Sequence, residues 1–182
     1  KETFYPGWPQ HENEHETEFL QRMKDAFQKK DAVLLGLYLQ TAGRLQGYLE
    51  DVFIEGQMCR RFPGSIRQGI LQNRKRNMEQ ISSLKEQIGQ NKSKLKIMLL
   101  LLVQYMFTHK VNIWDGEVAE YMELLRNCIP VVSEAISKSG ESVRYLATNQ
   151  ILLKLWPLFL EEAESIRKKA ENSMENNKEA LK

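Results

Sequence analysis

The chain has 182 residues, of which 42% are hydrophobic and 27% charged, and a formal net charge of +2. This length allows one domain with a buried core, and the composition excludes a low-complexity or collagen-like chain. The longest apolar run, residues 95–107, is shorter than the roughly 20 residues of a membrane span. We therefore expect a buried core helix there and no membrane segment.

The sequence predicts an all-α protein, because good helix formers recur and strand-like alternation is nearly absent. Residues 1–10 carry two prolines, a glycine and three aromatic side chains, which indicates an extended aromatic arm. Residues 11–170 should form a single all-helical domain, and residues 171–182 a frayed polar tail. The expected architecture is an irregular helical bundle or a short helical stack of about six to seven helices.

A zinc-peptidase pattern, H-E-x-x-H, occurs at residues 11–15. Its surroundings contradict an active site, because four glutamates lie between positions 12 and 18 and Pro9 precedes the first histidine. A catalytic metal site needs a cavity that excludes water, and a helix with this many charged residues cannot form its floor. We interpret the stretch as the solvated start of the first helix. The sequence contains no phosphate-binding glycine loop and no nucleophile motif, so we expect no catalytic residue, no metal and no cofactor.

A second helix is expected from residue 32 to about residue 55, with Asp31 as its cap. One face of this helix carries small residues at helical spacing: Ala32, Gly36, Gly43 and Gly47. A mid-helix glycine costs about 1 kcal/mol relative to alanine. We therefore expect another helix to approach this face closely.

A third helix is expected from Ile66 to about Gln90, with Ser65 as its cap. Its apolar residues form a thin stripe on a polar rod. The candidate partner-binding residues of this stripe are Ile70, Met78, Ile81, Leu84 and Ile88.

The same part of the chain is strongly basic, because residues 59–96 hold ten basic and two acidic side chains, a net charge of +8. The candidate partner-binding members of this basic island are Arg60, Arg61, Arg67, Arg74, Lys75 and Arg76. The island could bind an acidic protein segment, bind nucleic acid, or be only a solvated face. Aromatic side chains between the charges are absent apart from Phe62, which disfavours base stacking.

A central fourth helix is expected at about residues 95–109, with Ser93 or Asn91 as its candidate cap. Three more helices should follow it. Asp115 should cap the fifth helix and Pro130 should open the sixth. The seventh should begin near Ser142, and Pro157 should kink or restart it.

Residues 128–156 resemble an armadillo repeat, in which an Ile-Pro pair opens one helix and a short polar turn leads to a longer helix. The pair here is Ile129-Pro130, the turn is "SKSGES", and residues 143–155 carry the apolar pattern of the longer helix. Residues 93–107 resemble the third helix of a preceding repeat. This resemblance implies an armadillo- or HEAT-like stack whose surface binds other proteins.

The two cysteines, Cys59 and Cys128, are too few for a disulfide framework. We expect reduced thiols in an intracellular protein of the cytoplasm, the nucleus or both. A secreted four-helix cytokine with the two cysteines bridged is the alternative.

Taken together, these features favour a non-enzymatic adaptor or scaffold domain that binds a partner helix or acidic peptide, as part of a larger complex. Self-association through the same stripe is possible. The alternative is a nucleic-acid-binding helical domain that uses the basic island of residues 60–96.

Overall fold

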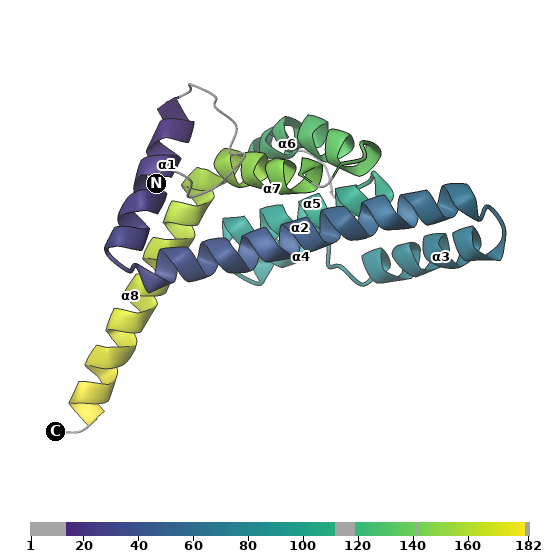
Figure 1. The fold of residues 1–182 in the computed structure, drawn as a ribbon. Helices are drawn as coiled ribbons and strands as arrows, with labels where there is room; N and C mark the ends of the chain where they lie inside the picture. Colours follow the sequence, from purple (N-terminus) through teal and green to yellow (C-terminus); the bar gives the residue numbers. More distant parts are fainter. Residues whose placement is uncertain (1–13, 112–118, 141, 181–182) are drawn as a thin grey trace.

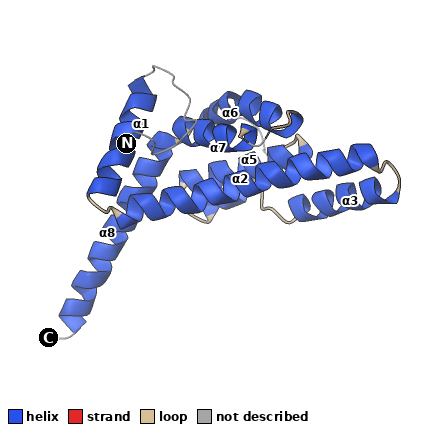
Figure 2. Ribbon diagram, viewed as in Figure 1, coloured by secondary structure: helices blue, strands red, loops and turns tan. Residues whose placement is uncertain are grey.

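A computed structural model describes residues 14–111, 119–140 and 142–180 of the chain. These residues form helices and no strands, which confirms the all-α prediction (Figure 2). The expected aromatic arm, residues 11–13 of the H-E-x-x-H pattern and the expected Asp115 cap lie outside the described residues. The described helices are α1 Glu14–Gln28, α2 Ala32–Arg61, α3 Ser65–Glu79, α4 Leu84–Gly89, α5 Lys94–Thr108, α6 Ala119–Ser137, α7 Val143–Lys154 and α8 Trp156–Ala180.

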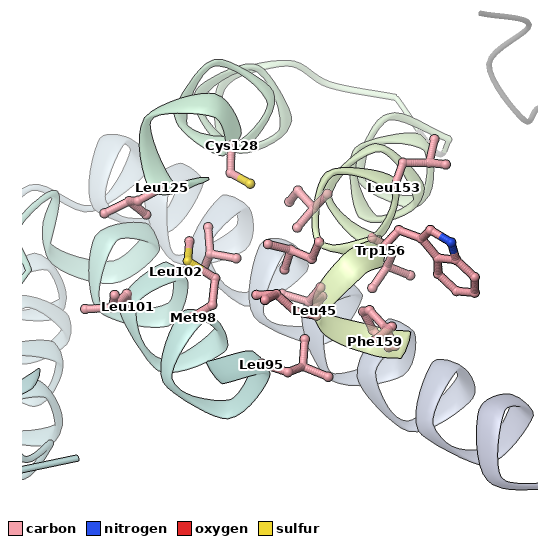
Figure 3. Close-up of a cluster of buried hydrophobic side chains, with 14 of the residues drawn as sticks. Leu45, Leu95, Met98, Leu101, Leu102, Leu125, Cys128, Leu153, Trp156 and Phe159 are labelled. Atoms are coloured by element: carbon pink, nitrogen blue, oxygen red, sulfur yellow. The ribbon is translucent and has the colours of Figure 1, made fainter. Parts of the chain in front are cut away.

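Helix α5 is central, as its apolar sequence predicts. It packs against α2, α3, α4, α6 and α8, and its residues Met98, Leu101 and Leu102 are fully buried. Complete burial of one such side chain is worth about 2 kcal/mol. Figure 3 shows these residues meeting Leu45 of α2 and Phe159 of α8 in one cluster.

The long helix α2 spans the molecule (Figure 1). Its N-terminal part contacts the bundle, and its C-terminal part extends beside α3. The C-terminal half of α8 also projects from the body (Figure 1). The polar stretch from residue 171 is helical as far as Ala180, and its fraying in solution stays a prediction.

Short-range capping explains several helix starts. The Asp31 carboxylate accepts a hydrogen bond from the Leu34 amide at 3.1 Å, and the Ser93 hydroxyl accepts one from the Lys96 amide at 3.4 Å. Both caps agree with the sequence prediction. The expected Ser65 cap is wrong by one residue, because Gly64 precedes the helix and Ser65 is its first residue.

Two predicted helix boundaries differ from the structure. The third helix is split, because a short break ends α3 at Glu79 and Ser83 then caps α4. The fifth and sixth helices are one, because Pro130 lies inside α6. A proline in a helix interior costs about 3 kcal/mol. The burial of Leu125, Cys128 and Val132 on both sides of it offsets that cost.

The chain restarts where the sequence predicts it. Helix α7 ends at Lys154, and α8 begins at Trp156, immediately before Pro157. The ring of Pro157 removes one backbone donor, so a continuous helix is disfavoured at this point. Trp156 is buried and stacks on Phe159, with 6.4 Å between the ring centroids.

The small-residue face of α2 does not receive another helix, so this prediction is wrong for the described part of the chain. Gly36, Gly43 and Gly47 are exposed, and a Cβ atom built on any of them would meet no atom within 4 Å. Ala32 is exposed as well. The pattern of small residues was present, but the side of α2 that packs is the opposite one.

Candidate interaction surface on the α2–α3 hairpin

The basic island begins on a helical hairpin formed by the C-terminal part of α2 and by α3 (Figure 1). Helix α3 contacts α2 and α5, yet none of its residues is buried. It therefore forms a thin outer layer on the body, with most of its surface open to solvent.

Arg74 is the one member of the predicted basic set that is turned inward. Its side chain is only 13% exposed, and its Nε atom lies 2.5 Å from Oε2 of Glu55. Its two terminal nitrogens donate to the carbonyl oxygens of Val52 and Phe107, each at 3.3 Å. Arg74 thus joins α3 to α2 and α5, which makes it a structural residue instead of a free binding residue.

The other arginines of the predicted set are exposed. Among the described residues no ion pair involves Arg60, Arg61, Arg67 or Arg76. The Arg61 guanidinium lies over the Phe62 ring, 5.5 Å from its centroid. These cations are available to an external anion.

The remaining basic residues of the island lie in other settings. Lys75 makes an exposed ion pair with Glu79 at 3.7 Å. Lys94 and Lys96 belong to the start of α5, where they pair with glutamates of α6 and α8. The island is therefore divided between the hairpin and a second region near α8.

The predicted apolar stripe is divided too. Ile70, Met78 and Ile81 are half-buried on α3 and just after it. Leu84 is in the core and Ile88 is exposed, both on α4. The five residues therefore differ in burial and do not form one exposed surface.

The structure reveals apolar exposure that the sequence prediction missed. Five large apolar side chains within residues 54–71 are each 38–51% exposed. They are Ile54, Met58, Phe62, Ile66 and Leu71. Two of them, Ile54 and Met58, are spaced by four and lie on one face of α2, and Phe62 directly follows the end of this helix. That spacing was readable in the sequence, but it did not say which side of α2 would face solvent.

We name this set the hairpin patch: the five apolar residues together with Arg60, Arg61 and Arg67. Exposed apolar side chains beside unpaired arginines are typical of protein interfaces, where arginine is enriched. Between residues 52 and 78 the only acidic side chain is Glu55, and it is paired with Arg74, so the charge around the patch favours an acidic partner.

The remaining structural findings concern metal ligands, membrane spans and the two thiols of the described residues. Among them, no group of three or more His, Cys, Asp or Glu side chains could hold a metal ion. No described helix has both the length and the apolar character needed to cross a membrane. Cys59 is half-buried and Cys128 is buried, and both thiols are free.

Comparison with known proteins adds no identity. No model of a known protein family, no curated protein and no solved structure matches this chain. The armadillo-like resemblance accordingly stays a prediction, and the structure places its Ile-Pro landmark inside α6 and not at a helix start.

Proposed function

We propose that this chain is a non-enzymatic interaction domain whose hairpin patch binds an acidic, amphipathic segment of a partner protein. The observation that carries the proposal is the combination of five exposed apolar side chains with three unpaired arginines on a projecting hairpin. The free thiols agree with an intracellular setting, in the cytoplasm or nucleus, within a larger complex.

The partner's chemistry follows from the patch. Ile54 and Met58, one turn apart on α2, and Phe62 just after the end of α2 offer apolar contacts to the apolar side chains of a partner helix. The arginines beside these residues would pair with glutamate or aspartate on the flank of the same partner helix, since arginine forms bidentate bonds with carboxylates. Pairs of this kind also speed association at low ionic strength.

The hairpin patch suits a protein better than a nucleic acid. Phosphate backbones require cations but give no place to exposed isoleucine, methionine and leucine side chains. Phe62 is the only aromatic side chain in the patch, so stacking on several bases has no support. Binding to nucleic acid is the alternative outcome of the test.

The test uses designed helical peptides that share one apolar face and differ in the opposite face, which is glutamate-rich or lysine-rich. Fluorescence anisotropy at low salt should show binding of the acidic peptide and at least about tenfold weaker binding of the basic one. Equal binding of the two peptides would contradict the proposed charge recognition. Duplex and single-stranded DNA are tested in the same buffer, and tighter binding of either one would replace the proposal with the alternative.

Charge reversal at Arg60, Arg61 and Arg67 should abolish binding of the acidic peptide. The matched control reverses three exposed cations elsewhere, Arg126, Lys168 and Lys169, and should bind as the parent does. Ile54→Ser with Met58→Ser should weaken binding by at least about tenfold, because apolar anchors carry much of the energy of such interfaces. Sedimentation of the parent protein alone tests self-association through the same patch.

A further inference from the structure

A second site lies away from the hairpin patch, between α2, α5 and α8. It is a pocket of about 480 Å³, within the size range of small-molecule sites. Six of its thirteen lining residues are aliphatic, namely Leu37, Leu45, Leu95, Leu99, Leu100 and Val103. A pocket with this lining favours a hydrocarbon group.

A polar hollow of about 330 Å³ adjoins the apolar pocket at the start of α5. Lys92, Leu95, Lys96 and Glu162 line both of them, so the two cavities lie next to each other. The charged side chains that line the polar hollow are Lys92, Lys94, Lys96, Lys169, Glu161 and Glu162. Four cations against two anions leave this end of the combined cavity positive.

The ion pairs sharpen this charge balance. Glu162 is almost completely buried and lies 3.5 Å from Lys96, so each neutralises the other. Lys94 is likewise paired with Glu161 at 4.0 Å and with Glu120 at 3.5 Å. These two carboxylates raise the pKa of Lys94, which therefore stays protonated. Among the described residues, no ion pair involves Lys92 or the nearby Arg44 of α2.

The geometry points to a binding site for a single-chain anionic amphiphile, with its hydrocarbon chain in the apolar pocket and its carboxylate or phosphate head in the polar hollow. Lys92 lines both compartments and would meet the head where it joins the chain. Lys169 in the polar hollow and Arg44 on the wall of the apolar pocket add two more cations, and among the described residues neither takes part in an ion pair.

The positions of the charged residues that line the two cavities favour an amphiphile of this kind over a docked helix. Three of the four charged residues that line the apolar pocket are those shared with the polar hollow. One polar end and one apolar end match a molecule with a single head and a single chain. An amphipathic helix would instead need polar contacts along both edges of a groove.

Calorimetric titration at concentrations below micelle formation tests the site with four probes: decanoate, decyl phosphate, decyltrimethylammonium and inorganic phosphate. The first two should bind, and the last two should bind at least about tenfold more weakly. Equal or tighter binding of the cationic probe would overturn the charge assignment. Equal binding of inorganic phosphate would overturn the role of the apolar pocket, and no binding of decanoate or decyl phosphate would overturn the site.

Substitutions locate the bound probe. Leu99→Trp should fill the apolar pocket and reduce decanoate affinity by about tenfold or more, whereas Leu39→Trp, at a 59% exposed position of α2, should not. The double substitution Lys92→Gln and Arg44→Gln changes only exposed or half-buried side chains, so the fold should be kept. It should also weaken the binding of decanoate. Lys168→Gln is its control. Unchanged affinity in both pocket variants would refute the proposed position.

Discussion

Arg144 of α7 and Glu50 of α2 form an ion pair at the centre of the helix packing, with 2.6 Å between Nε and Oε2. The Arg144 side chain is only 6% exposed. Its terminal nitrogens donate to the carbonyl oxygens of Lys138 and Gly140, at 3.1 and 2.8 Å. The guanidinium also lies 4.1 Å from the centroid of the Phe53 ring. One side chain therefore holds the turn after α6 against α2.

Arg144→Ala should lower the free energy of unfolding by about 2–4 kcal/mol, because it removes a buried charge pair and leaves two carbonyls unpaired. Glu50 is partly exposed and can be rehydrated, which places the cost below that of a fully buried pair. Urea unfolding measures the change. Arg126→Ala, at an exposed position of α6, is the control. Equal stability of the two variants would show that the contacts of Arg144 do not stabilise the fold.

The exposed glycines of α2 predict the opposite effect. Gly36→Ala, Gly43→Ala and Gly47→Ala should each raise the free energy of unfolding by about 0.5–1 kcal/mol, because alanine favours the helix and finds open space. Gly140→Ala should instead destabilise, since φ is +140° there and the new Cβ would lie 3.0 Å from Val143. Thermal unfolding of the four variants measures these changes in stability. Destabilisation by the three α2 substitutions would mean that the glycine face of α2 is covered in solution.

How far the sequence predicts the fold depends on the range of the interactions involved. The Asp31 and Ser93 caps are contacts over three residues, and both were predictable. The interior position of Pro130 was not, because its cost is offset by packing of α6 against α2, α5 and α7, which a local pattern does not contain. The glycine spacing on α2 defined a face of the helix but not whether that face is buried.

The candidate site shows the same limit. The charge of residues 59–96 is evident from the sequence, yet Arg74 and Arg76 have different environments although they lie on one helix. Arg74 meets Glu55, which is nineteen residues earlier in the chain. Only the packing of α3 against α2 brings these two side chains together, so the separation of structural from free arginines required the structure.

Arg74→Ala should loosen α3 and reduce stability by about 1–3 kcal/mol, since it removes the Glu55 pair and two bonds to backbone carbonyls. Arg76→Ala, two residues later and exposed, should change stability by less than about 0.5 kcal/mol. Hydrogen exchange of the α3 amides should be faster in the first variant alone. Similar exchange in both variants would argue that Arg74 is not what fixes α3.

Cys128 predicts a pH dependence. Burial raises the pKa of its thiol from the ordinary value of 9.0 to about 11, and the charge of Lys154 opposes this shift only in part. The folded protein thus holds this proton more tightly than the unfolded chain does. The resulting stabilisation is complete below about pH 9 and is lost as the pH rises towards about 11.

The measurement is urea unfolding between pH 8 and pH 11, in about one-unit steps, for the parent and for Cys128→Ala. The alanine variant has a constant packing deficit from its lost sulfur and no thiol at position 128 to titrate, whereas Cys59 is present in both proteins. The difference in stability between the two proteins should therefore shrink at high pH. Titration of native protein with a thiol reagent at about pH 8 should modify half-buried Cys59 first and Cys128 only after unfolding. A constant stability difference, or rapid modification of Cys128, would show that this thiol is not held neutral by the core.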